Sequence, residues 1–246
     1  MIGRFKYGDE IFYGEVRGEN VVANKGLYSD TFLISDLELL PPTQPSKIIC
    51  VGLNYRDHAK ELNMPVPPNP ILFLKPQSAV IGHLGNIVYP RSTSHMDYEG
   101  ELAVLIGKRC KNIRAADAKK VIMGYTCFND VTARDLQKKD TQWTRAKCFD
   151  TFAPIGPYIA DQKLDVSNLY IKTRVNGELR QDSSTSNLIF DVPHLVEFIS
   201  AIMTLEQGDV IATGTPPGVG ELRVGDEVEI EIQNIGTLKN RVVTQN

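Results

Sequence analysis

The stretch MDYEGELAVLIGK, residues 96–108, has the hydropathy pattern of a buried β-strand interrupted by two acidic residues. The apolar side chains recur at even intervals, as expected for a strand, at Tyr98, Leu102, Val104 and Ile106. Glu99 and Glu101 are two residues apart, so their side chains point to one face of the strand, about 7 Å apart. Neighbouring carboxylates repel, and carboxylates are rarely buried without a partner. The stretch therefore predicts a strand that presents two carboxylates to a common partner.

The rest of the sequence is also rich in strand patterns, and its helical segments are few and short. Residues up to about Leu40 are apolar runs broken by glycine and asparagine, as in a β-meander. The segment LLPPTQPSK, residues 39–47, carries three prolines and indicates a boundary. Strands and helices do not alternate regularly, so a doubly wound parallel fold or barrel is not expected. We predict a mainly β protein, with a small N-terminal β-rich domain at residues 1–45 and a catalytic domain at residues 46–246.

Two local patterns in the second half of the chain predict specific structures. Asn176-Gly177 stands between two strand-like runs, which is the pattern of a type I′ hairpin. The segment DVPHLVEFISAIM, residues 191–203, has the apolar periodicity of a helix, and Asp191 is placed to cap its first turn.

The composition is that of an ordinary globular protein and argues against several classes of partner. The 246 residues carry a formal net charge of −3 without a block of lysine or arginine, which argues against nucleic acid or an anionic membrane. No apolar run approaches the ~20 residues of a membrane span, and the N-terminus lacks the apolar core of a secretory signal. Without a C-x-x-C pair, the cysteines are expected to be free thiols in a reducing compartment, by default the cytoplasm. They are Cys50, Cys110, Cys127 and Cys148.

A third carboxylate is predicted at the end of another strand. Asp130 closes the strand-like segment YTCFNDV, residues 125–131, and loops at strand ends present side chains to clefts. A Glu-x-Glu pair alone is most often an exposed strand face, but carboxylates from two strands could also meet at one cation. Ligation by oxygen atoms alone suits Mg²⁺, Mn²⁺ or Ca²⁺ better than Zn²⁺ or Cu²⁺. Three protein ligands would leave positions open for water and substrate.

The segment RDHAKELN, residues 56–63, is predicted to form one or two helical turns. His58 and Glu61 are three residues apart, so they can touch on one face of a helix. They are either a solvated surface pair or a general-base dyad in which Glu61 orients His58 to activate water. A zinc-protease site is excluded, because the H-E-x-x-H motif is absent.

Two further segments carry groups whose role has more than one interpretation. Lys147 stands among aromatic residues in WTRAKCFDTFAP, residues 143–154. It is either a surface lysine with a partly buried stem or a cation aimed at a developing enolate or oxyanion. The segment ATGTPPGVG, residues 212–220, is either a plain turn or a loop whose N–H groups and Thr215 hydroxyl bind a carboxylate. It matches neither a P-loop nor a Rossmann fingerprint.

The clusters together resemble the fumarylacetoacetate hydrolase family, from Ile48 to the C-terminus. The matching segments are VGLNYRDHAKE, PILFLKP, DYEGELAVLIGK, GYTCFNDVTARDLQ, TRAKCFDTFAPIGP and GDVIATGTPPGVG. The N-terminal segment resembles the variable leader domain of many bacterial and archaeal members. The resemblance implies a mixed β-roll and a homodimer.

The resemblance also assigns roles to individual residues. It implies that Mg²⁺ or Mn²⁺, with Ca²⁺ as a further option, is bound by Glu99, Glu101 and Asp130. It implies that His58 and Glu61 form a water-activating dyad on a lid helix, and that Lys147 stands beside the metal and stabilises the enolate. The positions that would line the pocket or bind the substrate are Lys75, Arg134, Gln137 and Thr215.

The resemblance finally implies a reaction. Family substrates carry a 2-oxo acid or β-diketo acid unit whose carboxylate and oxo group chelate the metal. We expect a divalent-metal-dependent C–C bond hydrolase of small 2,4-diketo acids, of the acylpyruvate type, that acts through a metal-bound enolate. The same site would serve an oxaloacetate decarboxylase or an oxo-diacid isomerase or tautomerase. A non-catalytic module that binds 2-oxo acids is the alternative from another class, and loss of His58, Glu61 or Lys147 would have indicated it.

Overall fold

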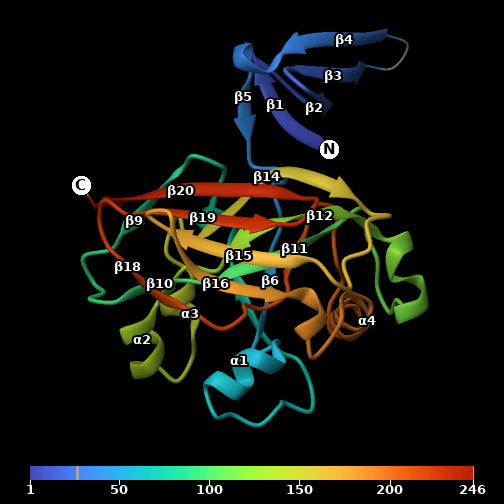
Figure 1. The fold of residues 1–246 in the computed structure, drawn as a ribbon. Helices are drawn as coiled ribbons and strands as arrows, with labels where there is room; N and C mark the ends of the chain where they lie inside the picture. The colour runs from blue at the N-terminus through green and yellow to red at the C-terminus, as the bar shows by residue number, and fades with distance from the viewer. Residues whose placement is uncertain (26–27, 246) are drawn as a thin grey trace.

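The computed structural model describes residues 1–25 and 28–245, and most of its regular structure is β-sheet (Figure 1). The large sheet has the order β4 (Tyr28–Leu33), β3 (Asn20–Lys25), β2 (Glu10–Arg17), β1 (Ile2–Tyr7), β14 (Ala153–Asp161), β12 (Ile122–Asn129), β11 (Gly100–Ile106), β17 (Val210–Ala212), β6 (Ile48–Gly52) and β7 (Ile71–Lys75). Two more strands join it at its side, β5 (Glu38–Leu40) beside β1 and β8 (Val80–Ile81) beside β14. The predicted mainly β fold is confirmed.

Two smaller sheets complete the body. One has the order β16 (Glu178–Ser184), β15 (Tyr170–Val175), β19 (Glu227–Ile232), β20 (Gly236–Thr244) and β9 (Asn86–Tyr89). The other has the order β13 (Thr132–Ala133), β10 (Met96–Tyr98) and β18 (Gly220–Leu222). The α-helices of the described residues are α1 (Arg56–Glu61), α2 (Arg134–Lys139), α3 (Thr144–Lys147) and α4 (Val192–Ile202). Short 3₁₀ turns are η1 (Ile34–Asp36), η2 (Gln77–Ala79), η3 (Ala115–Lys120) and η4 (Thr185–Asn187).

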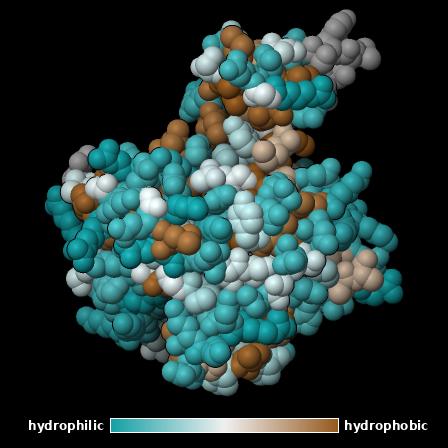
Figure 2. All heavy atoms as spheres, viewed as in Figure 1, coloured by the Kyte–Doolittle hydropathy of each residue, from teal (hydrophilic) through white to brown (hydrophobic). Residues whose placement is uncertain are grey.

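The strands β1 to β5 form a unit that stands apart from the body, at the side opposite α1 (Figure 1). Its β1 continues the large sheet through the pairing of Ile2 with Ile159. Apolar atoms gather where this unit meets the body, whereas the rest of the visible face is mainly hydrophilic (Figure 2). The boundary predicted at residue 45 falls between β5 and β6, and the division into two domains remains a prediction.

The main core lies between the large sheet, the five-stranded sheet and α4. All seven residues of β11 are buried, because β12 and β17 pair with its two edges and other layers cover its faces. Leu102 and Val104 of β11 belong to the same apolar cluster as Ile230 of β19 and Leu195 of α4. Such a packed support holds the groups at the end of β11 in fixed positions.

The two local predictions for the second half of the chain, a hairpin turn and a capped helix, are confirmed. Asn176 and Gly177 have positive φ, of 52° and 81°, as a type I′ turn requires between β15 and β16. Asp191 caps α4, since its carboxylate accepts a hydrogen bond from His194 N at 2.9 Å. No helix in the described part of the chain has the length and apolar character to cross a bilayer.

The strand predicted in the stretch of residues 96–108 is interrupted at Glu99. β10 ends at Tyr98 and pairs with β13 and β18, whereas β11 begins at Gly100 and pairs with β12 and β17. Glu99 N donates to the Asn129 side chain at 3.0 Å, and Gly100 N donates to the Gln181 side chain at 3.0 Å. Side chains therefore accept the two backbone N–H groups at this crossover, and Glu99 lies between two sheets.

Candidate active site

The three predicted ligands Glu99, Glu101 and Asp130 come together in the structure, where one oxygen of each lies within 4.8 Å of the others. All three side chains are buried. The pairing of Gly100 with Asn129 aligns β11 and β12, so that residues 99 and 130 meet at the ends of the two strands. The backbone adds a direct link, since Asp130 N donates to Glu99 O at 2.9 Å. The sheet register therefore builds the cluster.

Cations neutralise two of these carboxylates. Lys147 Nζ lies 2.9 Å from Glu99 Oε2 and 2.7 Å from Asp130 Oδ2. Arg134 donates to the other Glu99 oxygen. Burial raises the pKa of Glu99, but the charges of Lys147 and Arg134 outweigh burial and hold that pKa well below its ordinary value. Burial lowers the pKa of Lys147, yet the charges of Asp130 and Glu99 more than reverse this, so Lys147 carries a proton.

Glu101 has no such partner. Its Oε2 accepts the backbone N–H of Gly214 at 2.8 Å, and no cation of the described residues lies within ion-pair distance of it. Burial and the charges of Asp130 and Glu99 raise its pKa well above the ordinary value. A hard divalent cation would remove this conflict, because three converging carboxylates are the oxygen donors that Mg²⁺ and Mn²⁺ prefer. The donor set therefore fits the predicted metal.

The carboxylates lie at one side of a cavity of about 360 Å³. The predicted residues that line it with them are His58, Lys147, Arg134, Gln137 and Thr215. A larger cavity, of about 580 Å³, lies beside the N-terminus of α4 and contains none of the three carboxylates. The polar cavity is the candidate active site, because convergent polar groups and perturbed pKa values mark functional pockets better than size does.

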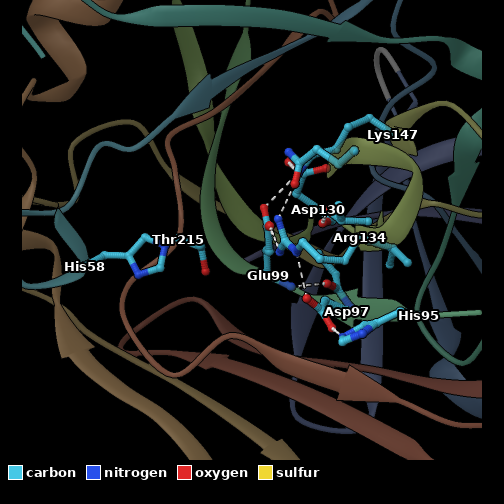
Figure 3. A network of polar contacts seen from close by, with 12 residues as sticks. His58, His95, Asp97, Glu99, Asp130, Arg134, Lys147 and Thr215 are labelled. Atoms are coloured by element: carbon cyan, nitrogen blue, oxygen red, sulfur yellow. Dashed lines mark hydrogen bonds and ion pairs between the residues drawn. The ribbon is translucent and has the colours of Figure 1, made fainter. Parts of the chain in front are cut away.

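His58 and Glu61, the pair predicted on the first helix, are in contact, and their role as a dyad remains a prediction. His58 Nδ1 lies 2.7 Å from Glu61 Oε2 across one turn of α1. Glu61 Oε1 accepts the backbone N–H of Gly218 at 3.1 Å, which ties α1 to the loop before β18. Nε2 is then the ring nitrogen left for a proton transfer, and Figure 3 shows the His58 ring on the same side of the site as Thr215.

The structure places the four expected substrate-binding residues differently. Arg134 and Gln137 line the cavity and bond to each other. The Thr215 hydroxyl donates to Gly100 O at 3.0 Å and accepts from Gln181 at 2.8 Å, so its proton is already used. Lys75 lies outside the cavity lining and is fully buried. Its ammonium is 2.6 Å from Asp130 Oδ1 and donates to the carbonyls of Val131 and Phe152, so it contacts a predicted metal ligand from outside the cavity.

The sequence analysis did not predict the residues that hold the Arg134 side chain in position. Arg134 Nε donates to Asp97 Oδ2 at 2.7 Å, and His95 Nε2 lies 2.8 Å from Asp97 Oδ1. Figure 3 shows Arg134 between Asp97 and Glu99, with His95 beyond Asp97. Asp97 alternates with Glu99 in the same segment, and this continued acidic spacing was the signal that could have found it.

Comparisons with known proteins identify the family. Residues 47–243 match the fumarylacetoacetate (FAA) hydrolase C-terminal family. The chain is 45% identical to the solved 5-carboxymethyl-2-hydroxymuconate delta-isomerase of Mycobacterium smegmatis, with a TM-score of 0.91 over 100% of this chain and 99% of that one. It is 47% identical over 216 residues to a mitochondrial oxaloacetate tautomerase of Bos taurus, covering 83% of this chain and 69% of that protein.

A third similar protein was solved with ligands. It is the maleylpyruvate hydrolase of a Sphingobium species in complex with manganese(II) and pyruvate, 30% identical, with a TM-score of 0.84 over 100% of this chain and 99% of that one. Similar proteins therefore include isomerases, tautomerases and hydrolases. The family match over four-fifths of the chain, together with these likenesses over its whole length, shows that this protein belongs to the fumarylacetoacetate hydrolase family.

Proposed function

We propose that the protein is a divalent-metal-dependent enzyme that converts small 2-oxo acids through an enolate. Its first candidate reaction is hydrolysis of a C–C bond in 2,4-diketo acids of the acylpyruvate type. The observation that carries this proposal is that His58, paired with Glu61, lines the same cavity as Glu99, Glu101 and Asp130. A proton-transfer group and a cation site then act on one bound molecule.

The polar side of the cavity would bind the 2-oxo acid unit. Mg²⁺ or Mn²⁺ held by the three carboxylates would supply Lewis acidity toward the carboxylate and 2-oxo oxygens of the substrate. Arg134 uses three of its five N–H donors on Asp97, Glu99 and Gln137, which leaves two for a substrate carboxylate. The Lys147 ammonium would stabilise negative charge that develops on the substrate oxygens.

His58 would provide the proton transfer. With Nδ1 facing Glu61, Nε2 accepts a proton from a water molecule that attacks the distal carbonyl carbon. The bond between that carbon and the central carbon breaks, its electron pair forms the enolate, and a proton then converts the enolate to the 2-oxo acid. Acetylpyruvate and water would give acetate and pyruvate.

Isomerisation or tautomerisation is the second candidate. The observation that favours it is the similarity of about 45% to proteins named as an isomerase and an oxaloacetate tautomerase. In this reaction His58 would move a proton between carbon and oxygen without an attacking water. Decarboxylation of oxaloacetate would reach an enolate by loss of CO₂ at the same site.

The test is direct. The purified protein is incubated with Mg²⁺ or Mn²⁺, and in parallel with EDTA, against acetylpyruvate, oxaloacetate and an unsaturated oxo-diacid, and products are followed by proton NMR. Metal-dependent acetate and pyruvate support hydrolysis, whereas keto–enol exchange or a shifted double bond supports the second candidate. Pyruvate from oxaloacetate alone would indicate a decarboxylase. Binding without any turnover, by protein shown to hold the metal, would overturn the enzyme proposal in favour of a binding module.

A His58→Ala variant separates the reactions further. It should abolish hydrolysis, which needs an activated water, and spare metal-dependent decarboxylation, which needs none. Equal loss of both activities would contradict this separation of roles.

A further inference from the structure

The candidate active site has two chemically different sides. The carboxylates, Lys147 and Arg134 make one side. The other side consists of apolar side chains from β6 and the residue after it, from β7, from the segment after α1 and from the N-cap of α3, namely Val51, Leu53, Leu62, Met64, Ile71, Phe73 and Trp143. Among the described lining residues, the charged group outside the polar side is the exposed Lys138 of α2.

The apolar residues of this lining form the apolar wall of the cavity, and direct contacts join its central part. Gly52 pairs with Ile71 across β6 and β7, and Phe73 follows two residues later on the same face. The Trp143 ring covers Gly52, where an added Cβ would lie 3.1 Å from Cζ3 of the indole. The same ring meets Phe73 edge to face, with centroids 5.3 Å apart. Glycine at position 52 thus lets the edge of the indole approach the strand closely.

The wall begins beside the reacting centre. Lys147 Nζ lies 4.9 Å from the centroid of the Phe73 ring, and the same nitrogen is ion-paired with Glu99 and Asp130. From Phe73 the wall extends to Ile71, about 7 Å farther along the strand. A 2-oxo acid unit held at the carboxylates would therefore direct its far end along apolar groups.

Part of this wall is open to water. Leu62, Met64 and Ile71 are 48%, 50% and 43% exposed, although all three line the cavity. Large apolar side chains that remain exposed along a cavity mark a surface that a ligand covers. Leu62 and Met64 directly follow α1, which carries His58, so contact with them would also position the dyad.

We infer that the substrate is a 2-oxo acid whose far end is apolar, such as an acyl chain of several carbons or a phenyl group, rather than a dicarboxylic acid. The wall has no cation of its own for a second carboxylate, whereas each methylene that it removes from water should improve binding about threefold to fourfold. This inference rests on the proposed function.

The first experiment is a substrate series. With Mg²⁺ present, kcat/KM is measured for acetylpyruvate, butanoylpyruvate, hexanoylpyruvate and benzoylpyruvate, and for the dicarboxylates fumarylpyruvate and oxaloacetate. We expect kcat/KM to rise along the acyl series and to be about tenfold or more lower for the dicarboxylates. A preference for the dicarboxylates that a Lys138→Ala variant removes would overturn the inference and leave the proposed function intact.

A charge placed on the wall provides the second test. Met64→Lys should lower the hexanoylpyruvate-to-acetylpyruvate ratio of kcat/KM about tenfold. The matched control is Val224→Lys, which adds the same charge at another half-exposed apolar residue, outside the cavity lining, and should leave the ratio unchanged. An unchanged ratio in Met64→Lys would overturn the inference. If no compound reacts, the proposed function fails. Calorimetry of the same acyl series on metal-loaded protein still tests the wall, and affinity independent of chain length would contradict it.

Discussion

Gly218 donates its backbone N–H to Glu61 Oε1 at 3.1 Å, and this contact connects the helix α1 to the loop that precedes β18. The second oxygen of the same carboxylate holds His58 Nδ1 at 2.7 Å. One side chain thus positions the imidazole and the loop together. Gly218 has a φ of +91°, and an added Cβ there would lie 2.2 Å from Arg180 O, so the loop depends on glycine at this position.

Replacing Glu61 with glutamine should disable the dyad without unfolding the protein. Glutamine has one oxygen, so it cannot accept from both His58 Nδ1–H and Gly218 N–H, and one of these donors would face an NH₂ group. We expect kcat to fall about 10²- to 10⁴-fold. The melting temperature should stay unchanged, because the Glu61 side chain is 43% exposed. Glu178→Gln, at an exposed side chain outside the site, is the control, and full activity of Glu61→Gln would contradict the role of the dyad.

Replacing Glu101 with alanine should abolish binding of Mg²⁺ or Mn²⁺ and all activity. The fold should persist, because the substitution removes one ligand of a repelling cluster and no apolar core group. Isothermal titration calorimetry with each metal measures the first effect, and circular dichroism checks the second. Wild-type metal affinity in the variant would show that the cation binds elsewhere.

Repulsion among the three carboxylates should make the stability of the metal-free protein depend on pH. The pKa of Glu101 is raised above its ordinary value of 4.5, so folded protein retains a proton that the unfolded chain releases. The contribution of Glu101 to stability is full below pH 4.5 and is lost as the pH rises through the raised pKa. In EDTA, Glu101→Gln should remove this fall and melt above wild type at neutral pH. If the melting temperatures of wild type and Glu101→Gln differed by the same amount at every pH, the raised pKa of Glu101 would be contradicted.

Asp97 should act through Arg134. The Asp97→Asn substitution weakens the contact with Arg134 Nε, now 2.7 Å, and leaves the guanidinium less firmly oriented. We expect KM for the 2-oxo acid to rise about tenfold, with a smaller change in kcat, because the metal ligands and the dyad are intact. His95→Gln, one step farther from Arg134, should show a smaller effect in the same direction. A pure loss of kcat for Asp97→Asn would argue against a role in substrate binding.

Asp209 should stabilise the junction between the proline-rich segment at residues 39–47 and the large sheet. Its carboxylate accepts from Ser46 N, Lys47 N and Glu206 N and pairs with Lys47 Nζ. Burial raises its pKa, but the contacts to Lys47, Glu206 and Ser46 outweigh burial and lower it below 3.8. The stabilisation is therefore present above pH 3.8 and lost as the pH falls through the lowered value.

The Asp209→Asn variant tests this contribution by urea unfolding. At neutral pH the free energy of unfolding should fall by about 1–3 kcal/mol, because a charged acceptor of several hydrogen bonds is lost. The difference from wild type should shrink in acid, below about pH 4. A difference that is independent of pH would assign the effect to packing.

Local patterns predicted the parts of the molecule that depend on neighbouring residues. The turn at Asn176-Gly177, the cap at Asp191 and the helical pairing of His58 with Glu61 all follow from backbone preferences or spacing along one element. The interruption at Glu99 did not follow, because it depends on Asn129 and Gln181, which are 30 and 81 residues away from the groups they bind. The placement of Lys75 beside Asp130 likewise depends on its contacts with Val131 and Phe152, which are 56 and 77 residues away.

By itself the sequence determined that this chain forms a mainly β member of its family, with three carboxylates, a histidine–glutamate pair and a lysine in the expected segments. The tertiary structure alone decided their electrostatics. Lys147 reaches Glu99 and Asp130 across 48 and 17 residues, and this leaves Glu101 as the carboxylate without a cation. The physical reason is that periodicity fixes which face a side chain occupies, whereas charge pairing inside a buried site depends on strand register and on contacts between distant segments.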